Sequence, residues 1–504
     1  MDLFSNLALG FATAVSLQNF AYCFLGVLLG TVVGVLPGIG PVATISMLLP
    51  ITYGIEPTGA LIMLAGIYYG AQYGGSTTSI LVNLPGEASS VVTCIDGYQM
   101  ARNGRAGPAL AIAAVGSFVA GTFATVLCAL MAAPLARVAS QFGPAEYFSL
   151  MVLGLIGAVV LANRSVVRAI GMVIVGLILG LVGTDVNTGT SRFTFGIHDL
   201  YDGIGFVAVA VGMFAISEIV GNLGQLEKRE VFTSRVTGLM PTRADLKASA
   251  LPIARGTLLG SALGVLPAGG ALIASFASYA LEKRVAKDPS RFGKGAIEGV
   301  AGPEAANNAG AQTSFIPILT LGIPPNVVMA LMVGALLLHN IQPGPQIMTK
   351  QPALFWGLIA SMWIGNLMLV ILNLPLVGLW VKLLSIPYRL LYPAIILFCC
   401  IGVFTLANNV TDVFIAALFG LVGYALSKIG CEPAPMLLGF VLGPMMEEYF
   451  RRALLIERGD PSVFVTRPIS AILLAIALVM IASLLLPAIG RARQKAVSEA
   501  ERSG

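Results

Sequence analysis

Two short polar segments are the best candidates for binding a small solute. The first begins with two glycines and continues with four hydroxyl side chains, which are Ser76, Thr77, Thr78 and Ser79. The second, EAANNAGAQTS from Glu304, carries amide and hydroxyl side chains, of which the candidates are Asn307, Asn308, Thr313 and Ser314. Hydroxyls and amides near a helix N-terminus can bind a carboxylate together with free backbone N–H groups. We therefore expect these side chains to contact a carboxylate substrate; interhelical hydrogen bonding or N-capping is the competing interpretation.

Two other segments are suited to bind a cation through backbone carbonyls. In each of them proline and glycine interrupt a long apolar run, at Pro37, Gly38 and Gly40 and again at Pro267, Gly269 and Gly270. Proline removes a helical hydrogen bond, and glycine permits an unwound stretch. A single interruption is best explained as a kinked helix packed on glycines. Two interruptions at equivalent places favour a transport site, where the unwound carbonyls would suit a coupling Na⁺.

Several acidic residues lie near the ends of apolar runs, namely Glu87, Asp96, Glu218, Glu304 and Asp412. An ionisable group inside a membrane is a functional candidate, although a solvated carboxylate is the simpler interpretation for each of them. Residues 447–452 space Glu and Arg by four residues twice, which predicts two ion pairs on a helix face. The chain has no Walker A, HExxH or GxSxG pattern, so we expect neither ATP hydrolysis nor other catalysis.

The composition predicts a membrane protein. Of the 504 residues, 57% are hydrophobic and only 11% are charged, and the mean hydropathy is +0.89. A soluble domain carries about 25% charged residues. Long stretches contain no Asp, Glu, Lys or Arg, for example between Asp2 and Glu56 and between Glu304 and Lys350. A β-barrel would show short alternating segments instead, so we predict an all-α polytopic protein with roughly 11 to 13 spans or half-spans.

An internal repeat divides the chain into two halves. Residues 26–40 read GVLLGTVVGVLPGIG and residues 256–270 read GTLLGSALGVLPAGG, with 9 of 15 positions identical at an offset of 230. A weaker echo relates residues 74–79 to residues 309–314. We therefore expect an N-terminal membrane repeat over 1–226, a cytoplasmic linker over 227–255, a C-terminal membrane repeat over 256–490 and a charged tail over 491–504.

The loop charges predict that the two halves have opposite orientations. Basic residues precede and follow the opening of the second repeat, whereas the first opening is flanked only by Asp2 and Glu56. Basic loops are expected in the cytoplasm, and inverted halves with broken or re-entrant helices are typical of secondary transporters. The acidic loop 185–202 is expected outside, and the side of residues 447–467 is undetermined. Since the net charge of +5 lies in loops, it predicts no nucleic-acid partner.

Five blocks of sequence resemble one family of transporters. They are GVLPGIGPVATISMLLP (34–50), YYGAQYGGSTTSILVNLPGE (68–87), IDGYQMARNGRAGPAL (95–110), GPEAANNAGAQTSFIPILTLGIPPN (302–326) and GPMMEEYFRRAL with TRPIS (443–454 and 466–470). On these blocks the chain resembles the large membrane subunit of the tripartite tricarboxylate transporters, the TctA family. The resemblance implies a bacterial inner-membrane permease, driven by an ion gradient, that imports citrate or other carboxylates. It also implies two partners, a small membrane subunit and a periplasmic solute-binding protein.

Other functions fit fewer of these features. An ion channel would need a pore lined by repeated subunits or charged rings. A membrane-anchoring scaffold subunit would have no use for two interruptions in lipid-embedded helices, and a membrane enzyme would need clustered acids or metal ligands. The residues leave open which carboxylate is carried, whether Na⁺ or H⁺ is coupled, and the oligomeric state. We expect no cofactor apart from the coupling ion.

Overall fold

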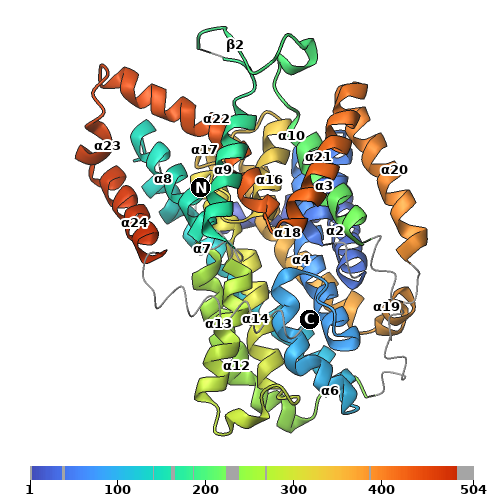
Figure 1. Ribbon diagram of the computed structural model, residues 1–504. Helices are drawn as coiled ribbons and strands as arrows, with labels where there is room; N and C mark the ends of the chain where they lie inside the picture. The colour runs from blue at the N-terminus through green and yellow to red at the C-terminus, as the bar shows by residue number, and fades with distance from the viewer. Residues whose placement is uncertain are drawn as a thin grey trace.

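The computed structural model describes residues 3–36, 40–139, 141–160, 165–185, 187–222, 238–266, 270–384 and 388–484. Most of these residues are helical (Figure 1). The strands among them are a two-residue antiparallel pair, β1 (Gly183–Thr184) and β2 (Ser191–Arg192). The prediction of an all-α protein is therefore confirmed.

The helices fall into two series. Those before residue 223 are α1 (Leu3–Ala14), α2 (Leu17–Val35), α3 (Pro41–Thr52), α4 (Pro57–Val82), η1 (Ala88–Ser90), α5 (Val91–Thr93), η2 (Cys94–Tyr98), α6 (Gln99–Arg102), α7 (Ala106–Ala139), α8 (Pro144–Val160), α9 (Val166–Gly180), η3 (His198–Leu200), α10 (Phe206–Ala210), η4 (Val211–Ile216) and α11 (Ser217–Asn222). Those after residue 237 are α12 (Arg243–Gly264), α13 (Gly270–Val285), η5 (Pro289–Arg291), α14 (Glu298–Thr313), α15 (Phe315–Leu321), α16 (Val327–Leu338), α17 (Gln346–Lys350), α18 (Pro352–Asn373), α19 (Val377–Leu383), α20 (Tyr388–Ala407), α21 (Val410–Lys428), α22 (Pro433–Ile456), α23 (Val463–Thr466) and α24 (Pro468–Leu484).

Several helices are long and apolar, and some of them carry exposed apolar side chains. In the described part of the chain, four helices are long and apolar enough to cross a membrane, judged by length and composition: α2, α7, α18 and α21. Shorter apolar helices of 10–17 residues, such as α9, accompany them. On α21, Leu418 and Leu421 are 58% and 62% exposed. An exposed apolar face of this kind marks contact with a membrane or another protein.

A row of glycines on α2 lets this helix pack closely on α4. The glycines are Gly26, Gly30 and Gly34, and the backbone carbonyls that face them belong to Met63, Ile67 and Ala71. A Cβ atom on any of these glycines would lie 2.3–2.4 Å from the facing oxygen. Small residues at such spacing allow two helix backbones to approach within a membrane.

The same contact occurs in the second half, between α12 and α14. The glycines there are Gly256, Gly260 and Gly264, and the facing carbonyls belong to Gly302, Ala306 and Gly310. A Cβ atom on these glycines would lie 2.2–2.4 Å from the facing oxygen. Each glycine of this set follows its counterpart on α2 by 230 residues, so the sequence repeat specifies a repeated helix–helix contact.

The partner helices α4 and α14 correspond at a different offset. The facing carbonyls of Met63 and Gly302 are 239 residues apart. At the same offset, Asn83 ends α4 and Gly322 ends α15, and both residues are left-handed, with φ of 60° and 76°. The sequence match of residues 74–79 with residues 309–314 has an offset of 235. This offset differs by four residues, about one helical turn, from the offset of 239 that the helix contacts give. Helix–helix contact, and not the matching of Gly and Thr letters, sets the equivalence.

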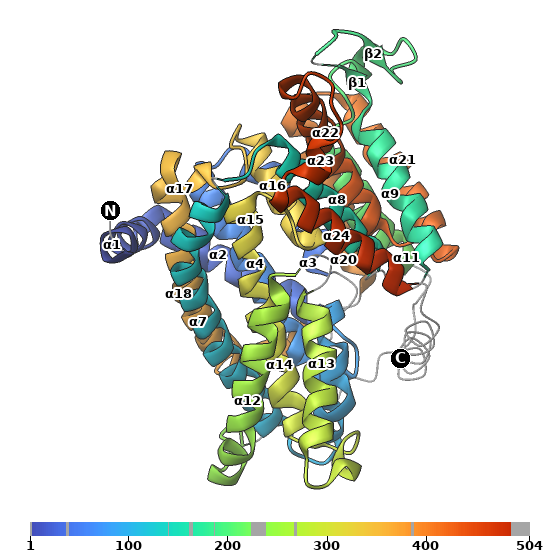
Figure 2. The ribbon, with the colours of Figure 1, turned by 90° about the vertical axis from the view of Figure 1, so that its left-hand side faces the viewer.

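The two repeated contacts lie at different levels of the molecule. Figure 2 shows α12, α13 and α14 side by side at one end, opposite the end that carries β1 and β2. Helix α2 contacts α3, and α12 contacts α13, so each interruption joins two helices that return toward each other. Of the interrupting residues, Gly40 is the N-cap of α3 and Gly270 is the first residue of α13. The others, Pro37, Gly38, Pro267 and Gly269, lie outside the described residues.

The second part of the linker expected over 227–255 is helical in the structure. Helix α12 begins at Arg243, because Thr242 and Asp245 form a capping box in which each side chain accepts the other's backbone N–H. Such a box satisfies two of the free N–H groups at a helix start. Residues 243–255 are therefore the first part of a helix, and residues 223–237 lie outside the described part of the chain.

The glycine contacts predict where an added methyl group will destabilise the protein. Gly30→Ala and Gly260→Ala place a Cβ atom 2.4 Å and 2.2 Å from the carbonyl oxygens of Ile67 and Ala306, so each should destabilise the protein by about 1–3 kcal/mol. Gly171→Ala on α9 is the matched control, because no atom lies within 4 Å of its Cβ position. Thermal unfolding of the purified chain in detergent measures the effect, and equal melting temperatures for all three variants would contradict it.

Candidate functional site

The hydroxyls of the first polar segment do not lie at a helix start. Helix α4 runs unbroken through Gly74 and Gly75, so Ser76–Ser79 occupy its last two turns and are at most 3% exposed. The expectation that these hydroxyls lie near a helix N-terminus is wrong. The role of the two glycines is close packing: a Cβ atom on Gly74 would lie 2.4 Å from the carbonyl oxygen of Thr31, and one on Gly75 would lie 3.1 Å from Glu87 Cγ.

Ser76 joins the two halves through a buried carboxylate of α14. Its hydroxyl donates to Glu304 Oε2 at 2.5 Å, and the hydroxyl of Thr93 donates to the other carboxylate oxygen. Glu304 is 0% exposed. The structure thus places an acid from the second polar segment directly against a hydroxyl from the first.

A second buried acid lies in the same layer. Glu87 accepts the backbone N–H of Ser89 at 3.0 Å and the side-chain amide of Asn307 at 3.1 Å, and it also accepts the Ser89 hydroxyl. The Ser89 hydroxyl lies 2.6 Å from Asn307 Oδ1 and 3.1 Å from Gln72 Oε1 as well. One hydroxyl proton is therefore shared among three acceptor oxygens. The neighbouring Asn308 donates to Ser117 Oγ at 2.7 Å.

The remaining hydroxyls of the two segments have other partners than Glu87 and Glu304. Thr78 donates to the carbonyl of Val35 at 2.8 Å and to that of Gly34 at 3.2 Å, at the end of α2. Ser79 bonds to Ser90, and Thr77 bonds to the carbonyl one turn before it. In the second half, Thr313 and Ser314 donate to the carbonyls of Ala309 and Ala311, and Ser314 also hydrogen-bonds to the side chain of Tyr68 on α4. The structure does not bring Thr313 or Ser314 into the layer that contains Ser76 and Glu304.

The described interrupting residues are not arranged around a cation. The N–H of Gly40 donates to Glu218 Oε1 at 3.4 Å, and the carbonyl of Gly40 accepts both the N–H and the hydroxyl of Thr44. A Cβ atom on Gly270 would lie 2.5 Å from Cα of Gly264, so this residue packs against the end of α12. A cation site at the interruptions stays a prediction.

One cavity touches the buried layer, and a second one lies at the end that carries β1 and β2. A very small one, about 10 Å³, is lined by side chains of α4, α7 and α18, which include Tyr73, Ser76, Thr77, Ser117 and Asn373. A large one, about 760 Å³, lies at the end that carries β1 and β2 and is lined by both halves of the chain. The small cavity has room for one water molecule, whereas the large one has room for a small organic acid.

Ion pairs line the large cavity. Arg192 pairs with Glu447 at 2.8 Å, and Arg451 pairs with Asp185 at 3.0 Å and with Glu447 at 2.6 Å. The predicted helix-face pairs are confirmed, because Glu447 and Glu448 of α22 each bind the arginine four residues later. Residues 447–452 therefore lie at the same end of the molecule as Asp185 and Arg192.

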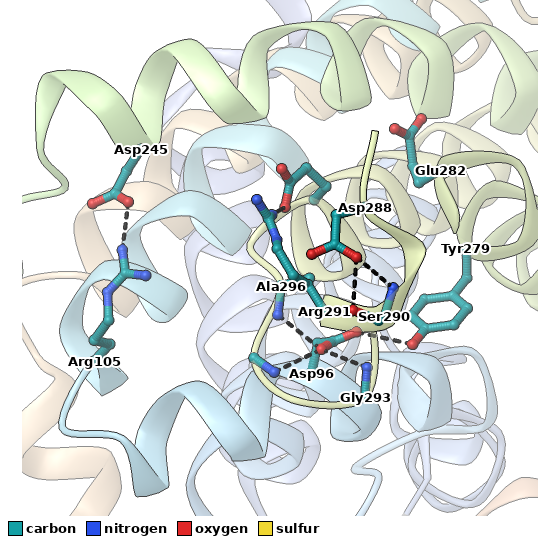
Figure 3. Close-up of polar contacts among 12 residues, drawn as sticks. Asp96, Arg105, Asp245, Tyr279, Glu282, Asp288, Ser290, Arg291, Gly293 and Ala296 are labelled. Atoms are coloured by element: carbon teal, nitrogen blue, oxygen red, sulfur yellow. Dashed lines mark hydrogen bonds and ion pairs between the residues drawn. The ribbon is translucent and has the colours of Figure 1, made fainter. Parts of the chain in front are cut away.

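The opposite end of the molecule is joined across the halves by Asp96 of η2. Its Oδ1 accepts backbone N–H groups of Gly293, Gly295 and Ala296 at 2.8–2.9 Å, and its Oδ2 accepts the Tyr279 hydroxyl at 2.9 Å (Figure 3). Asp96 is 0% exposed, so it is not a solvated carboxylate. The loop begins at Asp288, whose pKa is lowered by hydrogen bonds from the Ser290 hydroxyl and backbone N–H.

Several members of the buried layer are not evident from the sequence. Glu87 and Glu304 stand out only as acids near the ends of apolar runs. Gln72, Ser89 and Thr93 do not stand out as candidate site residues. One signal was present: the run of small hydroxyls after Glu87, in EASSVVT, fits a polar helix start inside an apolar region. Glu87 does cap η1, where its side chain accepts the N–H of Ser89.

Comparison with known proteins identifies the family. Residues 20–438 match the model of the tripartite tricarboxylate transporter TctA family. The chain belongs to the TctA family.

One relative from Agrobacterium vitis, described as "Uncharacterized 52.8 kDa protein in TAR-I ttuC' 3'region", is 61% identical over 499 residues, which cover 99% of each chain. Another from the same organism, "Uncharacterized protein in TAR-II ttuC' 3'region", is 62% identical over 240 residues, 48% of this chain and 99% of the relative. No solved structure matches. TctA membership makes the chain a multi-pass membrane transporter subunit that works with other subunits.

The different bonding of Thr78 and Thr313 predicts different mutant effects. Thr78→Val leaves carbonyls at the end of α2 without their hydroxyl donor and should cost about 1–3 kcal/mol of stability. Thr313→Val removes only a bond to the helix that carries it, so it should cost less than about 1 kcal/mol. Thermal unfolding in detergent compares the two variants. A larger loss for Thr313→Val would show that this hydroxyl has a role the contacts do not reveal.

Proposed function

We propose that this TctA chain is the permease subunit of a tripartite secondary transporter that imports small organic acids, tricarboxylates or related carboxylates, by alternating access driven by a cation gradient. The observation that carries the proposal is the buried polar layer between the halves. There Ser76 and Ser89 of the first half bond to Glu304 and Asn307 of the second. Burying polar and ionisable groups among apolar helices costs free energy, and such groups usually mark the path of a solute or an ion.

The substrate donors in this proposal are neutral. Among the described residues, no lysine, arginine or histidine forms an ion pair with Glu304 or Glu87. Hydroxyls and amides such as Ser76, Thr77 and Asn308 would replace the water of a carboxylate without holding it too tightly for release. An anion beside two carboxyl groups is repelled unless a cation arrives with it. Symport with a cation follows from this requirement.

The two ends of the molecule suit alternating access. The large cavity at the β1–β2 end admits a carboxylate, whereas Asp96 joins the halves at the other end. The lysines and arginines near that other end, such as Arg243, Lys283 and Lys294, favour the cytoplasm. We take the two halves, 1–226 and 256–490, as inverted repeats in a bacterial inner membrane, with the cavity facing outward. The glycine contacts repeated at an offset of 230 support this arrangement.

The tripartite family implies partners, which we take to be a small membrane subunit and a periplasmic solute-binding protein. The segment around β2 extends beyond the helices at the end of the large cavity (Figure 2). In this segment the side chain of Phe195 is 86% exposed and that of Phe193 is 52% exposed. Exposed aromatic side chains next to a cavity suit contact with a protein that delivers substrate.

The transport proposal predicts uptake that depends on an ion gradient and not on ATP. Membrane vesicles that contain the chain and its partner subunits should accumulate radiolabelled carboxylate when a pH or Na⁺ gradient is imposed. A panel from acetate through succinate and malate to citrate, each presented with the binding protein, identifies the substrate. Uptake that persists without gradients but requires ATP would contradict the proposal, and a flux that never saturates with substrate would favour a channel.

The partner proposal predicts that Phe195→Ala weakens docking of the binding protein. Loss of a central aromatic contact should raise the binding-protein concentration needed for half-maximal uptake about tenfold. Met240→Ala is the control, because Met240 is 87% exposed near the opposite end of the molecule. Uptake titrated with binding protein measures both variants. If Phe195→Ala behaves like the control, the binding protein docks elsewhere.

A further inference from the structure

We propose that the coupling cation is a proton and that Glu304, paired with Glu87, carries it. This inference rests on the proposed transport function and assigns the coupling site within it. Glu304 comes from α14 of the second half and Glu87 from the segment after α4 of the first half. The bound proton would therefore lie where the two halves meet.

The first argument is charge. Glu304 is 0% exposed and Glu87 is 9% exposed, and no cationic side chain of the described residues forms an ion pair with either. An isolated carboxylate in a low-dielectric interior is very costly, and two of them close together repel each other. The titratable groups that face Glu304 are Glu87, Tyr73 and Cys94, and none of them supplies a positive charge. A cation must therefore neutralise this layer.

The second argument is the set of partners, which favours a proton over Na⁺. Both oxygens of Glu304 already touch a hydroxyl, those of Ser76 and Thr93. A metal ion placed between these oxygens would have to separate them, whereas a proton fits within the existing hydrogen bonds. A hydroxyl can also reverse its role, donating to a carboxylate and accepting from a carboxylic acid. The same partners thus serve Glu304 with and without its proton.

The third argument is an independent feature beside the pair. Asn373 of α18 is 4% exposed, and its Oδ1 is buried with no hydrogen-bond partner. It lines the cavity of about 10 Å³ together with Ser76 and Thr77. A polar cavity of this size holds one water molecule. A water bound there satisfies Asn373 and contacts Ser76, and Ser76 in turn contacts Glu304, so the three form a route for the proton.

The coupling follows from the charges. A protonated Glu304 no longer repels an incoming carboxylate, so proton and substrate bind with positive cooperativity. Release of the proton on the other side restores the repulsion and expels the substrate. The proton balance is one proton taken up by the carboxylate on the outside and one released to water on the inside, with no other reactant.

The test separates carrying the proton from carrying the substrate. The full complex is reconstituted with the carboxylate that the wild type accumulates best, or with citrate where several are equal. Two readouts are taken: exchange of labelled for unlabelled carboxylate at equilibrium, and accumulation driven by a pH gradient with a pH-sensitive dye inside the vesicles. Glu304→Gln should exchange within about threefold of the wild type. It should lose gradient-driven accumulation and proton uptake, and its substrate affinity should no longer depend on pH.

Two further variants keep the result interpretable. Glu298→Gln, on the same helix, changes a carboxylate paired with Arg291 and should leave both readouts unchanged. Asn373→Leu fills the small cavity and should slow proton uptake while exchange continues. The inference is overturned if Glu304→Gln still accumulates substrate with the pH gradient. It is equally overturned if correctly inserted Glu304→Gln also loses exchange, or if only Na⁺ drives the wild type. A wild type that exchanges no carboxylate refutes the proposed function instead.

Discussion

The structure depends on direct backbone contact between paired helices. Three glycines on α2 touch carbonyls of α4, and three on α12 touch carbonyls of α14. In a membrane there is little hydrophobic drive to bring helices together, so close packing of small residues has to supply the attraction. Any side chain at these glycines would force the helices apart. Everything positioned by α4 and α14, including both polar segments, therefore relies on these contacts.

The same contacts explain how polar groups are kept inside an apolar protein. Because α2 lies so close to α4, the Thr78 hydroxyl reaches the last carbonyls of α2, where the helix is interrupted. Free carbonyls of this kind are tolerated in a membrane only when protein or water satisfies them. In the buried layer nearby, every partner of Glu87 and Glu304 is a hydroxyl, an amide or a backbone N–H. Close packing thus brings neutral donors within reach of the two buried carboxyl groups, and these donors offset part of the cost of burial without a basic residue.

The two ends of the molecule differ in what joins the halves. At one end Asp96 accepts three backbone N–H groups and a phenol from the second half, and Arg105 of the first half pairs with Asp245 of the second. At the other end the halves enclose a large cavity lined by paired arginines and acids. A transporter has to break contacts at one end while forming them at the other. The asymmetry agrees with the alternating access that we propose.

The sequence by itself determined the membrane class, the helical architecture and the family, because composition, charge-free runs and contiguous motifs are local properties. It also revealed the repeat, since a GxxxGxxxG pattern occurs in both halves at equivalent positions. It did not determine the equivalence of α4 and α14, which differs from the matching of letters by one helical turn, because contacts between helices decide it. The sequence grouped Ser76 and Asn307 with Thr313 and Ser314 as candidate substrate contacts, and the structure shows Ser76 bonded to Glu304 and Asn307 bonded to Glu87 across the halves. Only the tertiary structure showed that the hydroxyls of Thr313 and Ser314 donate to carbonyls of their own segment. Glu304, which lies about two and a half turns earlier on α14, contacts Ser76 instead. Packing decides which face of a buried helix contacts which neighbouring helix. When several faces of a helix carry small and polar side chains, its sequence does not identify the face that makes each contact.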